Sequence, residues 1–197
     1  MQKSILSAAI VAGALAMSSG ANASECGEIS MADMNWPSAT LMANVDKIIL
    51  EAGYGCEIEM VGGATTTTFA SMDNKGEPDV AAELWINAVR EPLFAAMDEG
   101  RLHSARSGPI TDLGEGWWLP PYTVAAHPEL KTVLDILERP DLFPDKEDPS
   151  RGAFIGCPAG WGCQLSNQSL FIAFEMEAKG WNLIDPGSQA GLEIGRA

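Results

Sequence analysis

Segments typical of strands alternate with segments typical of helices from residue 28 onward, and this alternation limits the possible folds more than any other feature. The strand-like runs lie at residues 28–31, 56–61 and 79–84. The helix-like stretches lie at residues 39–52, 67–75 and 87–99. Units of this length favour a parallel sheet with right-handed crossovers, so we predict an α/β fold.

The first helical stretch, residues 39–52, is amphipathic. Its larger apolar residues recur at helical spacing and share one face. They are Leu41, Met42, Val45, Ile48, Ile49 and Ala52. Gly53 is the expected C-cap, and the threonine run at 65–68 is expected to cap the second helix.

The alternation resumes after a polar stretch, residues 100–116. The strands expected there span residues 118–124, 153–156 and 181–184. The helices expected there span residues 130–138 and 164–179. We place the domain boundary at residues 110–118, which predicts two α/β lobes, 24–114 and 115–197.

Residues 1–23 have the pattern of a secretory signal peptide. Lys3 precedes an apolar run at residues 5–17, and Ala21-Asn22-Ala23 matches a cleavage site. We therefore expect export to the periplasm and a mature chain that begins at Ser24. The net charge of −15 disfavours nucleic acid and anionic membrane surfaces as partners, and solubility is its simplest explanation.

The chain has four cysteines, and an even number in an exported protein suggests two disulfides. Of the three possible pairings, proximity favours Cys157 with Cys163, which leaves Cys26 with Cys56. Cys26 and Cys56 stand at the starts of the first two predicted strands. A parallel sheet would place these starts side by side, so the pairing and the topology support each other.

The segment from Gly156 to Cys163 places Trp161 between two cysteines and among glycines. A disulfide would close this loop and hold the indole as a rigid aromatic wall. The helix that follows would place the amides of Gly162 and Cys163 at its N-terminus, where carboxylates bind. These features suit a zwitterion with a quaternary ammonium group and a carboxylate. The structural alternative is a stapled surface loop around a core tryptophan.

Five of the six tryptophans lie near expected carboxyl ends of strands, where open α/β sheets bind ligands. They are Trp36, Trp85, Trp117, Trp118 and Trp161. As a set they favour a ligand cage, whereas each one singly fits packing equally well. Asp33 and Glu83 approach the same rim and are candidates to balance a cation. A solvated role is the alternative for both carboxylates. Arg90 is a candidate partner for a ligand carboxylate, and the alternative is that it only covers its helix face.

Catalytic and metal-binding motifs are not found in the sequence. His103 and His127 lack metal-ligand spacing, so we expect no zinc site. There is no nucleophile elbow, Walker loop or dinucleotide fingerprint. We expect a binding protein without a cofactor and not an enzyme. An exported thiol-disulfide enzyme is a weaker alternative, because Cys157 and Cys163 lack the spacing of a thioredoxin-type pair.

The segment Cys157-Pro158-Ala159-Gly160-Trp161-Gly162-Cys163 resembles the disulfide loop of the ProX/OpuAC-type glycine betaine and proline betaine binding proteins of ABC transporters. Three other segments resemble the same family. They are Ala32-Asp33-Met34-Asn35-Trp36, Glu83-Leu84-Trp85 and Gly116-Trp117-Trp118-Leu119-Pro120. The resemblance covers nearly all of the chain after the signal peptide.

The resemblance implies a type II periplasmic binding protein fold, in which two α/β lobes close over a ligand held by aromatic rings. It implies Trp85 and Trp161 as walls of the cage, and the amides of Gly162 and Cys163 as donors to a carboxylate. Further cage positions of some branches, including choline binders, correspond to Trp36, Trp117, Trp118 and Tyr122.

The chain departs from the family pattern in two places. A histidine that helps to bind the carboxylate in the betaine branch is Val89 here, and Arg90 is a candidate substitute. Family members also continue past residue 197, with a further cage tryptophan and a return crossing into the first lobe. We therefore expect the second lobe to be incomplete in this chain, with the apolar faces of helices 39–52 and 164–179 partly uncovered.

The resemblance implies a monomeric periplasmic solute-binding protein that captures a quaternary ammonium compound and delivers it to an ABC permease for osmoprotection. A ligand sensor that docks on a membrane receptor is the alternative. The residues leave glycine betaine, proline betaine, choline and carnitine open as ligands.

Overall fold

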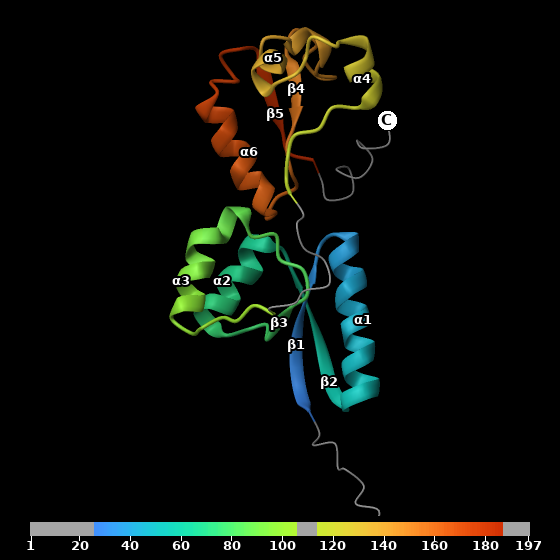
Figure 1. Cartoon of the computed structure of the whole chain (residues 1–197), viewed down its shortest axis with the longest axis vertical. Coiled ribbons are helices and arrows are strands. Elements are labelled where there is room, and N and C mark those ends of the chain that lie inside the picture. The colour runs from blue at the N-terminus through green and yellow to red at the C-terminus, as the bar shows by residue number, and fades with distance from the viewer. Residues whose placement is uncertain (1–25, 106–113, 187–197) are drawn as a thin grey trace, which may run out of the picture.

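A computed structural model of the protein describes residues 26–105 and 114–186 (Figure 1). The signal peptide expected at residues 1–23 lies outside the described residues, as does the first part of the boundary expected at 110–118. Within the described ranges, no helix is long and apolar enough to cross a membrane.

The first lobe is built on a parallel sheet of three strands in the order β2-β1-β3. The strands are β1 (Gly27–Met34), β2 (Cys56–Gly63) and β3 (Val80–Ala81). The parallel arrangement predicted from the alternation is therefore confirmed. The third strand is shorter than the predicted 79–84, because only Val80 and Ala81 pair with β1.

Both predicted disulfides are present. Cys26 and Cys56 are bonded, with their Cα atoms 4.5 Å apart. Gly27 pairs with Cys56, so the starts of β1 and β2 lie side by side as the disulfide requires. The second disulfide joins Cys157 and Cys163 in the loop after the first strand of the second lobe.

Helices cover both faces of the first sheet. They are α1 (Pro37–Tyr54), α2 (Thr65–Lys75) and α3 (Arg90–Asp98), with the 3-10 turn η1 (Asn87–Val89) before α3. α1 lies on one face of the sheet, and α2 and α3 lie on the other (Figure 1). Between α1 and the sheet, Met31, Ala43 and Ile58 belong to a buried core.

α1 is longer than predicted and packs through smaller residues. Pro37 is in its first turn, and Gly55 ends it in the left-handed conformation (φ 70°), so Gly53 is not the cap. The buried positions of the helix are Ala39 and Ala43, whose small side chains let the helix approach the sheet closely. Several larger apolar residues of the predicted face are exposed: Leu41, Val45, Ile48 and Ile49.

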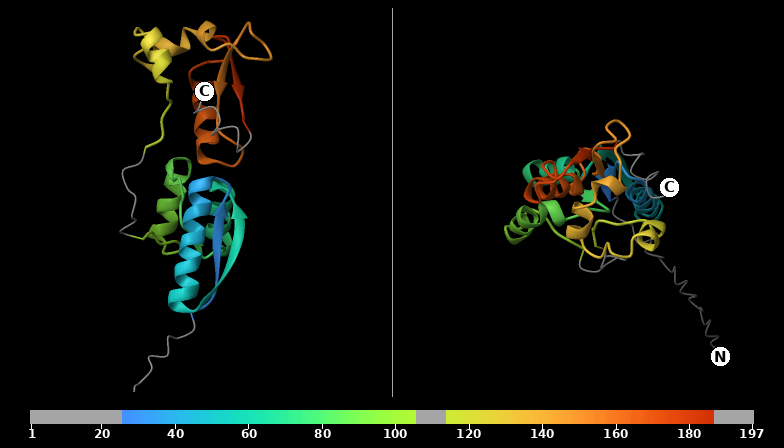
Figure 2. Two further views of the ribbon diagram at one scale, coloured as in Figure 1. Left: turned by 90° about the vertical axis from the view of Figure 1, so that its right-hand side faces the viewer. Right: turned by 90° about the horizontal axis from the view of Figure 1, so that it is seen from above.

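The second lobe is built on two parallel strands, β4 (Gly152–Ile155) and β5 (Trp181–Ile184). Its helices are α4 (Pro121–Ala126), α5 (Val133–Leu137) and α6 (Gly162–Ala173), with the 3-10 turn η2 (Pro140–Leu142). Aromatic side chains gather in its core around Leu137, Met176 and Trp181. Figure 2 shows both lobes from the side and from above.

One predicted element of the second lobe is wrong, and another is a helix with different ends. Residues 118–124 do not form a strand, and Pro121 instead begins α4. A proline fits the first turn of a helix but cannot donate a hydrogen bond to a sheet. The helix predicted at 164–179 begins at Gly162 and ends at Ala173. Glu175 has a φ of 52°, a conformation that does not continue a right-handed helix.

Asp79 ties the segment before β3 to β1, and we expect this tie to depend on pH. Its Oδ2 accepts hydrogen bonds from the Ser30 hydroxyl (2.6 Å) and the Ser30 N–H (2.8 Å), which lower the pKa of Asp79. A lowered pKa stabilises the fold above the unfolded carboxyl pKa, and this stabilisation is lost as the pH falls through the folded pKa.

Asp79→Ala should therefore reduce the free energy of unfolding by about 1 kcal/mol at pH 7, allowing for solvent exposure. The difference from the wild type should shrink as the pH falls below about 4. Urea unfolding at neutral and acid pH measures both effects. An equal deficit at the two pH values would show that the carboxylate is not the cause.

Candidate ligand-binding site

Three tryptophans that are distant in the sequence lie together where the two lobes meet. Trp36 follows β1, Trp85 follows β3, and Trp161 follows β4 in the disulfide loop. They pack in one hydrophobic cluster with Ala32 and Met34 of β1. We call Trp36, Trp85 and Trp161 the tryptophan cluster. The carboxyl ends of β1 and β2 are directed at the second lobe (Figure 1), which places the cluster where α/β sheets bind ligands.

Trp36 and Trp161 touch each other across the two lobes. Their ring centroids are 5.4 Å apart and their planes meet at 68°, an edge-to-face geometry that aromatic pairs favour. Trp36 is only 7% exposed, whereas Trp85 and Trp161 are half-buried. The rings of Trp85 and Trp161 therefore keep surface that a ligand can contact.

Glu83, one of the two carboxylates expected at the rim, holds two rings of the tryptophan cluster. Its Oε1 accepts hydrogen bonds from Nε1 of Trp36 (2.8 Å) and from Nε1 of Trp85 (2.7 Å). The Ser38 hydroxyl donates to the same oxygen at 3.1 Å. The bond to Trp36 could not be read from sequence spacing, because it depends on the pairing of β1 with β3. Glu83 therefore holds the rings of Trp36 and Trp85 through their indole N–H groups.

Asp33, the second rim carboxylate, is engaged within the first lobe. The Thr40 hydroxyl donates to its Oδ1 at 2.7 Å. Asp33 lies on β1 and Thr40 on α1, so this bond fixes the helix to the strand that it follows. The Asp33 carboxylate, which was expected to balance a ligand cation, therefore has a hydrogen-bond partner within the protein.

Polar contacts join the disulfide loop to the first lobe through Asn35 and Thr66, and no sequence pattern predicted this role for either residue. Asn35 Oδ1 accepts from Trp161 Nε1 at 2.8 Å. The Gly160 carbonyl accepts from the backbone N–H and the hydroxyl of Thr66, both at 3.2 Å. Thr66 was expected to cap α2, but α2 begins after Ala64 without a side-chain cap. Its hydroxyl instead contributes to the contact between the lobes.

α6 begins inside the disulfide loop and directs its N-terminus at the first lobe (Figure 1). Trp161 is the N-cap residue, and a helix of 12 residues follows it directly. Gly162 and Cys163 therefore supply first-turn N–H groups that have no acceptor within the helix. Together with the helix dipole, these groups make a favourable site for a carboxylate.

Trp117 lies in the core of the second lobe. Its ring centroid is 4.7 Å from that of Phe154, and it also packs against Phe174. Its Nε1 donates to Asn167 Oδ1 at 3.0 Å, so the indole N–H is satisfied within the lobe. The structure therefore places Trp117 outside the tryptophan cluster and gives it a packing role.

The three other predicted site residues are not packed in the tryptophan cluster either. Trp118 and Tyr122 are 85% and 61% exposed. Arg90 is on α3, where its guanidinium lies over the ring of Phe94, 5.5 Å from the centroid. This cation–π contact occupies the side chain that was expected to pair with a ligand carboxylate.

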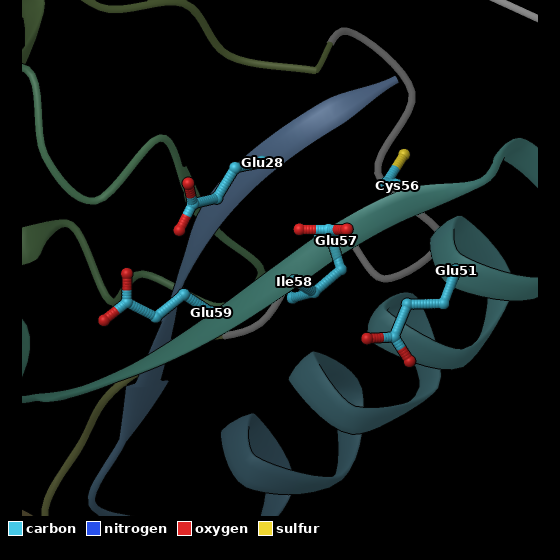
Figure 3. Close-up of a pocket in the computed structure, with 6 residues that line it drawn as sticks. All are labelled: Glu28, Glu51, Cys56, Glu57, Ile58 and Glu59. Atoms are coloured by element: carbon cyan, nitrogen blue, oxygen red, sulfur yellow. The ribbon is translucent and has the colours of Figure 1, made fainter. Parts of the chain in front are cut away.

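A hollow of about 390 Å³ lies at the opposite end of the first sheet, where β1 and β2 begin. It is lined by Glu28, Glu51, Cys56, Glu57, Ile58 and Glu59 (Figure 3). Its carboxylates would repel the carboxylate of a zwitterion, and it is not at the carboxyl ends of the strands. No group of three His, Cys, Asp or Glu residues in the described ranges is arranged to hold a metal ion. The tryptophan cluster is the better candidate site.

Gly160 provides a test of the contact between the lobes. It has a φ of 85°, and an added Cβ would lie 3.1 Å from the Cβ of Ala64 in the first lobe. Gly160→Ala should therefore lower the free energy of unfolding through backbone strain and also through this close approach, by roughly 2 kcal/mol in total.

Gly100→Ala is the matched control, because Gly100 has a φ of 73° but nothing within 4 Å of an added Cβ. Gly100→Ala should lower the free energy of unfolding through backbone strain alone, by about 1 kcal/mol. Urea unfolding of both variants gives the comparison. Equal losses would argue against a tight contact between Gly160 and the first lobe.

The sequence model of OpuAC, the substrate binding domain of ABC-type glycine betaine transport systems, matches residues 27–196. A search of curated proteins found no match. The matched range contains both sheets, both lobes and the tryptophan cluster. The family has the type II periplasmic binding protein fold and consists of substrate-binding domains and not of enzymes. The chain therefore belongs to the OpuAC family of substrate-binding domains of ABC-type glycine betaine transport systems.

Proposed function

We propose that this protein captures glycine betaine, or a closely related quaternary ammonium compound, in the periplasm and delivers it to an ABC permease for osmoprotection. The observation that carries the proposal is the tryptophan cluster beside the N-terminus of α6. The cluster presents aromatic surface, and the first turn of the helix has N–H groups without an acceptor within the helix. A betaine joins a cation and a carboxylate in one small molecule and so matches both features.

The trimethylammonium group is proposed to bind against the rings of Trp85 and Trp161, which are half-buried. A well-placed ring contributes on the order of 0.5–2 kcal/mol to the binding of a cation. The carboxylate is proposed to accept hydrogen bonds from the N–H groups of Gly162 and Cys163 at the start of α6. Trp36 is proposed to support both rings from its buried position.

The position of the site between the lobes supports a role in capture and delivery. Trp85 belongs to the first lobe, and Trp161 and α6 belong to the second. A ligand that contacts both sides favours the arrangement in which the lobes are together. We propose that the protein acts as a monomer after removal of residues 1–23, and that the permease recognises this closed arrangement.

Isothermal titration calorimetry with glycine betaine, proline betaine, choline and carnitine tests the proposal. We expect glycine betaine to bind more tightly than choline, because choline has no carboxylate for the N-terminus of α6. Choline binding as tightly as glycine betaine would remove α6 from the site. Failure of all four compounds to bind would contradict the proposed function.

Trp161→Ala should weaken glycine betaine binding by about 1–2 kcal/mol, or roughly 5- to 30-fold, because one aromatic wall is lost. Tyr54→Ala is a control that removes an exposed aromatic ring from the C-terminal end of α1. Calorimetry measures the affinities, and circular dichroism checks that each variant is folded. Unchanged affinity in a folded Trp161→Ala variant would exclude Trp161 from the site.

The same titration of Trp118→Ala tests the additional wall that the family resemblance implies. Trp118 is 85% exposed and is not packed in the tryptophan cluster. We therefore expect a smaller loss of affinity than for Trp161→Ala. A loss as large as that of Trp161→Ala would place Trp118 in the cage.

A further inference from the structure

Glu83 makes an unusual arrangement of hydrogen bonds for a residue close to a cation site. One carboxylate oxygen, Oε1, accepts from the indole N–H of Trp36 at 2.8 Å and from that of Trp85 at 2.7 Å. The two tryptophans come from different connections, one after β1 and one after β3. A single oxygen therefore fixes the orientation of two rings that lie in different connections of the chain.

The bonds to Glu83 also differ in kind from the bond that holds the third ring. Trp161 donates its N–H to the neutral amide oxygen of Asn35. Hydrogen bonds to a carboxylate are shorter and roughly twice as strong as those between neutral groups. Donation to an anion also polarises the donor, because hydrogen-bonded groups reinforce one another where water is partly excluded. The rings of Trp36 and Trp85 thereby gain electron density, which strengthens their attraction for a cation.

We propose that Glu83 is a positioning residue that also determines specificity. It orients the rings of Trp36 and Trp85 and, through its charge, makes the site prefer a quaternary ammonium group to a neutral group of the same shape. The specificity part rests on the proposed function, because it requires a quaternary ammonium ligand. The positioning part rests only on the hydrogen bonds that Trp36 and Trp85 donate to Glu83.

Two substitutions of Glu83 separate its effect on the orientation of the rings from the effect of its negative charge. Glu83→Gln keeps an oxygen acceptor of the same reach and removes the charge, whereas Glu83→Ala removes both. Glu59→Gln is the matched control, because it removes one negative charge from an exposed residue of β2. Glu59 lines the acidic hollow at the other end of the sheet (Figure 3).

The first measurement needs no ligand. The indole N–H resonances in the ¹H–¹⁵N spectrum should move for Trp36 and Trp85 in both Glu83 variants, and further in Glu83→Ala. The resonance of Trp181, which donates to the Leu137 carbonyl at 3.0 Å, should stay in place as an internal reference. Unmoved Trp36 and Trp85 resonances in folded Glu83→Gln and Glu83→Ala would overturn the positioning role.

The second measurement compares glycine betaine with 3,3-dimethylbutanoate, in which carbon replaces the charged nitrogen. Glu83→Gln should lower the affinity for glycine betaine about tenfold. It should lower the affinity for 3,3-dimethylbutanoate, which keeps the carboxylate but has a neutral tert-butyl group, by less than about twofold. Glu83→Ala should weaken both ligands, and Glu59→Gln should weaken neither. Equal losses for the two ligands in Glu83→Gln would overturn the role in specificity.

Failure of the inference can be told from failure of the proposed function. If the wild type binds glycine betaine but Glu83→Gln binds it equally well, the specificity role is wrong and the proposed function stands. If the wild type binds neither ligand, the proposed function fails and the specificity role falls with it. The indole spectra still decide the positioning role in that case.

Discussion

The candidate site depends on the contact between the disulfide loop and the first lobe. The Cys157–Cys163 bond closes the loop, and the Gly160 carbonyl accepts two hydrogen bonds from Thr66. This contact sets Trp161 edge-to-face against Trp36, and it directs the start of α6 at the first lobe. The contact therefore brings rings of the first lobe close to the N-terminus of α6.

The indole N–H groups of the tryptophans have partners in different parts of the molecule. Trp117 donates to Asn167 and Trp181 donates to the Leu137 carbonyl, so both bonds stay within the second lobe. Trp161 instead donates across the lobes, and Trp85 donates to a carboxylate shared with another ring. Each of these indoles has a partner for its N–H, and among them only Trp161 ties one lobe to the other.

Sequence patterns predicted the parts of the structure that follow from local periodicity and simple topology. The parallel pairing of β1 and β2 and the Cys26–Cys56 disulfide follow from the alternation of strands and helices. Residues 118–124 were mistaken for a strand because their aromatic and β-branched residues outweighed the helix-starting role of Pro121. The hydrogen bond from Trp36 to Glu83 depends on which strands become neighbours, so no spacing in the sequence could indicate it.

The central claim is that the tryptophan cluster and the N-terminus of α6 form one ligand site. A crystal structure of the protein with glycine betaine tests this claim most directly. We expect the trimethylammonium group against the rings of Trp85 and Trp161, and the carboxylate within hydrogen-bond distance of the N–H groups of Gly162 and Cys163. Glycine betaine bound away from these residues, or with its carboxylate remote from α6, would contradict the claim.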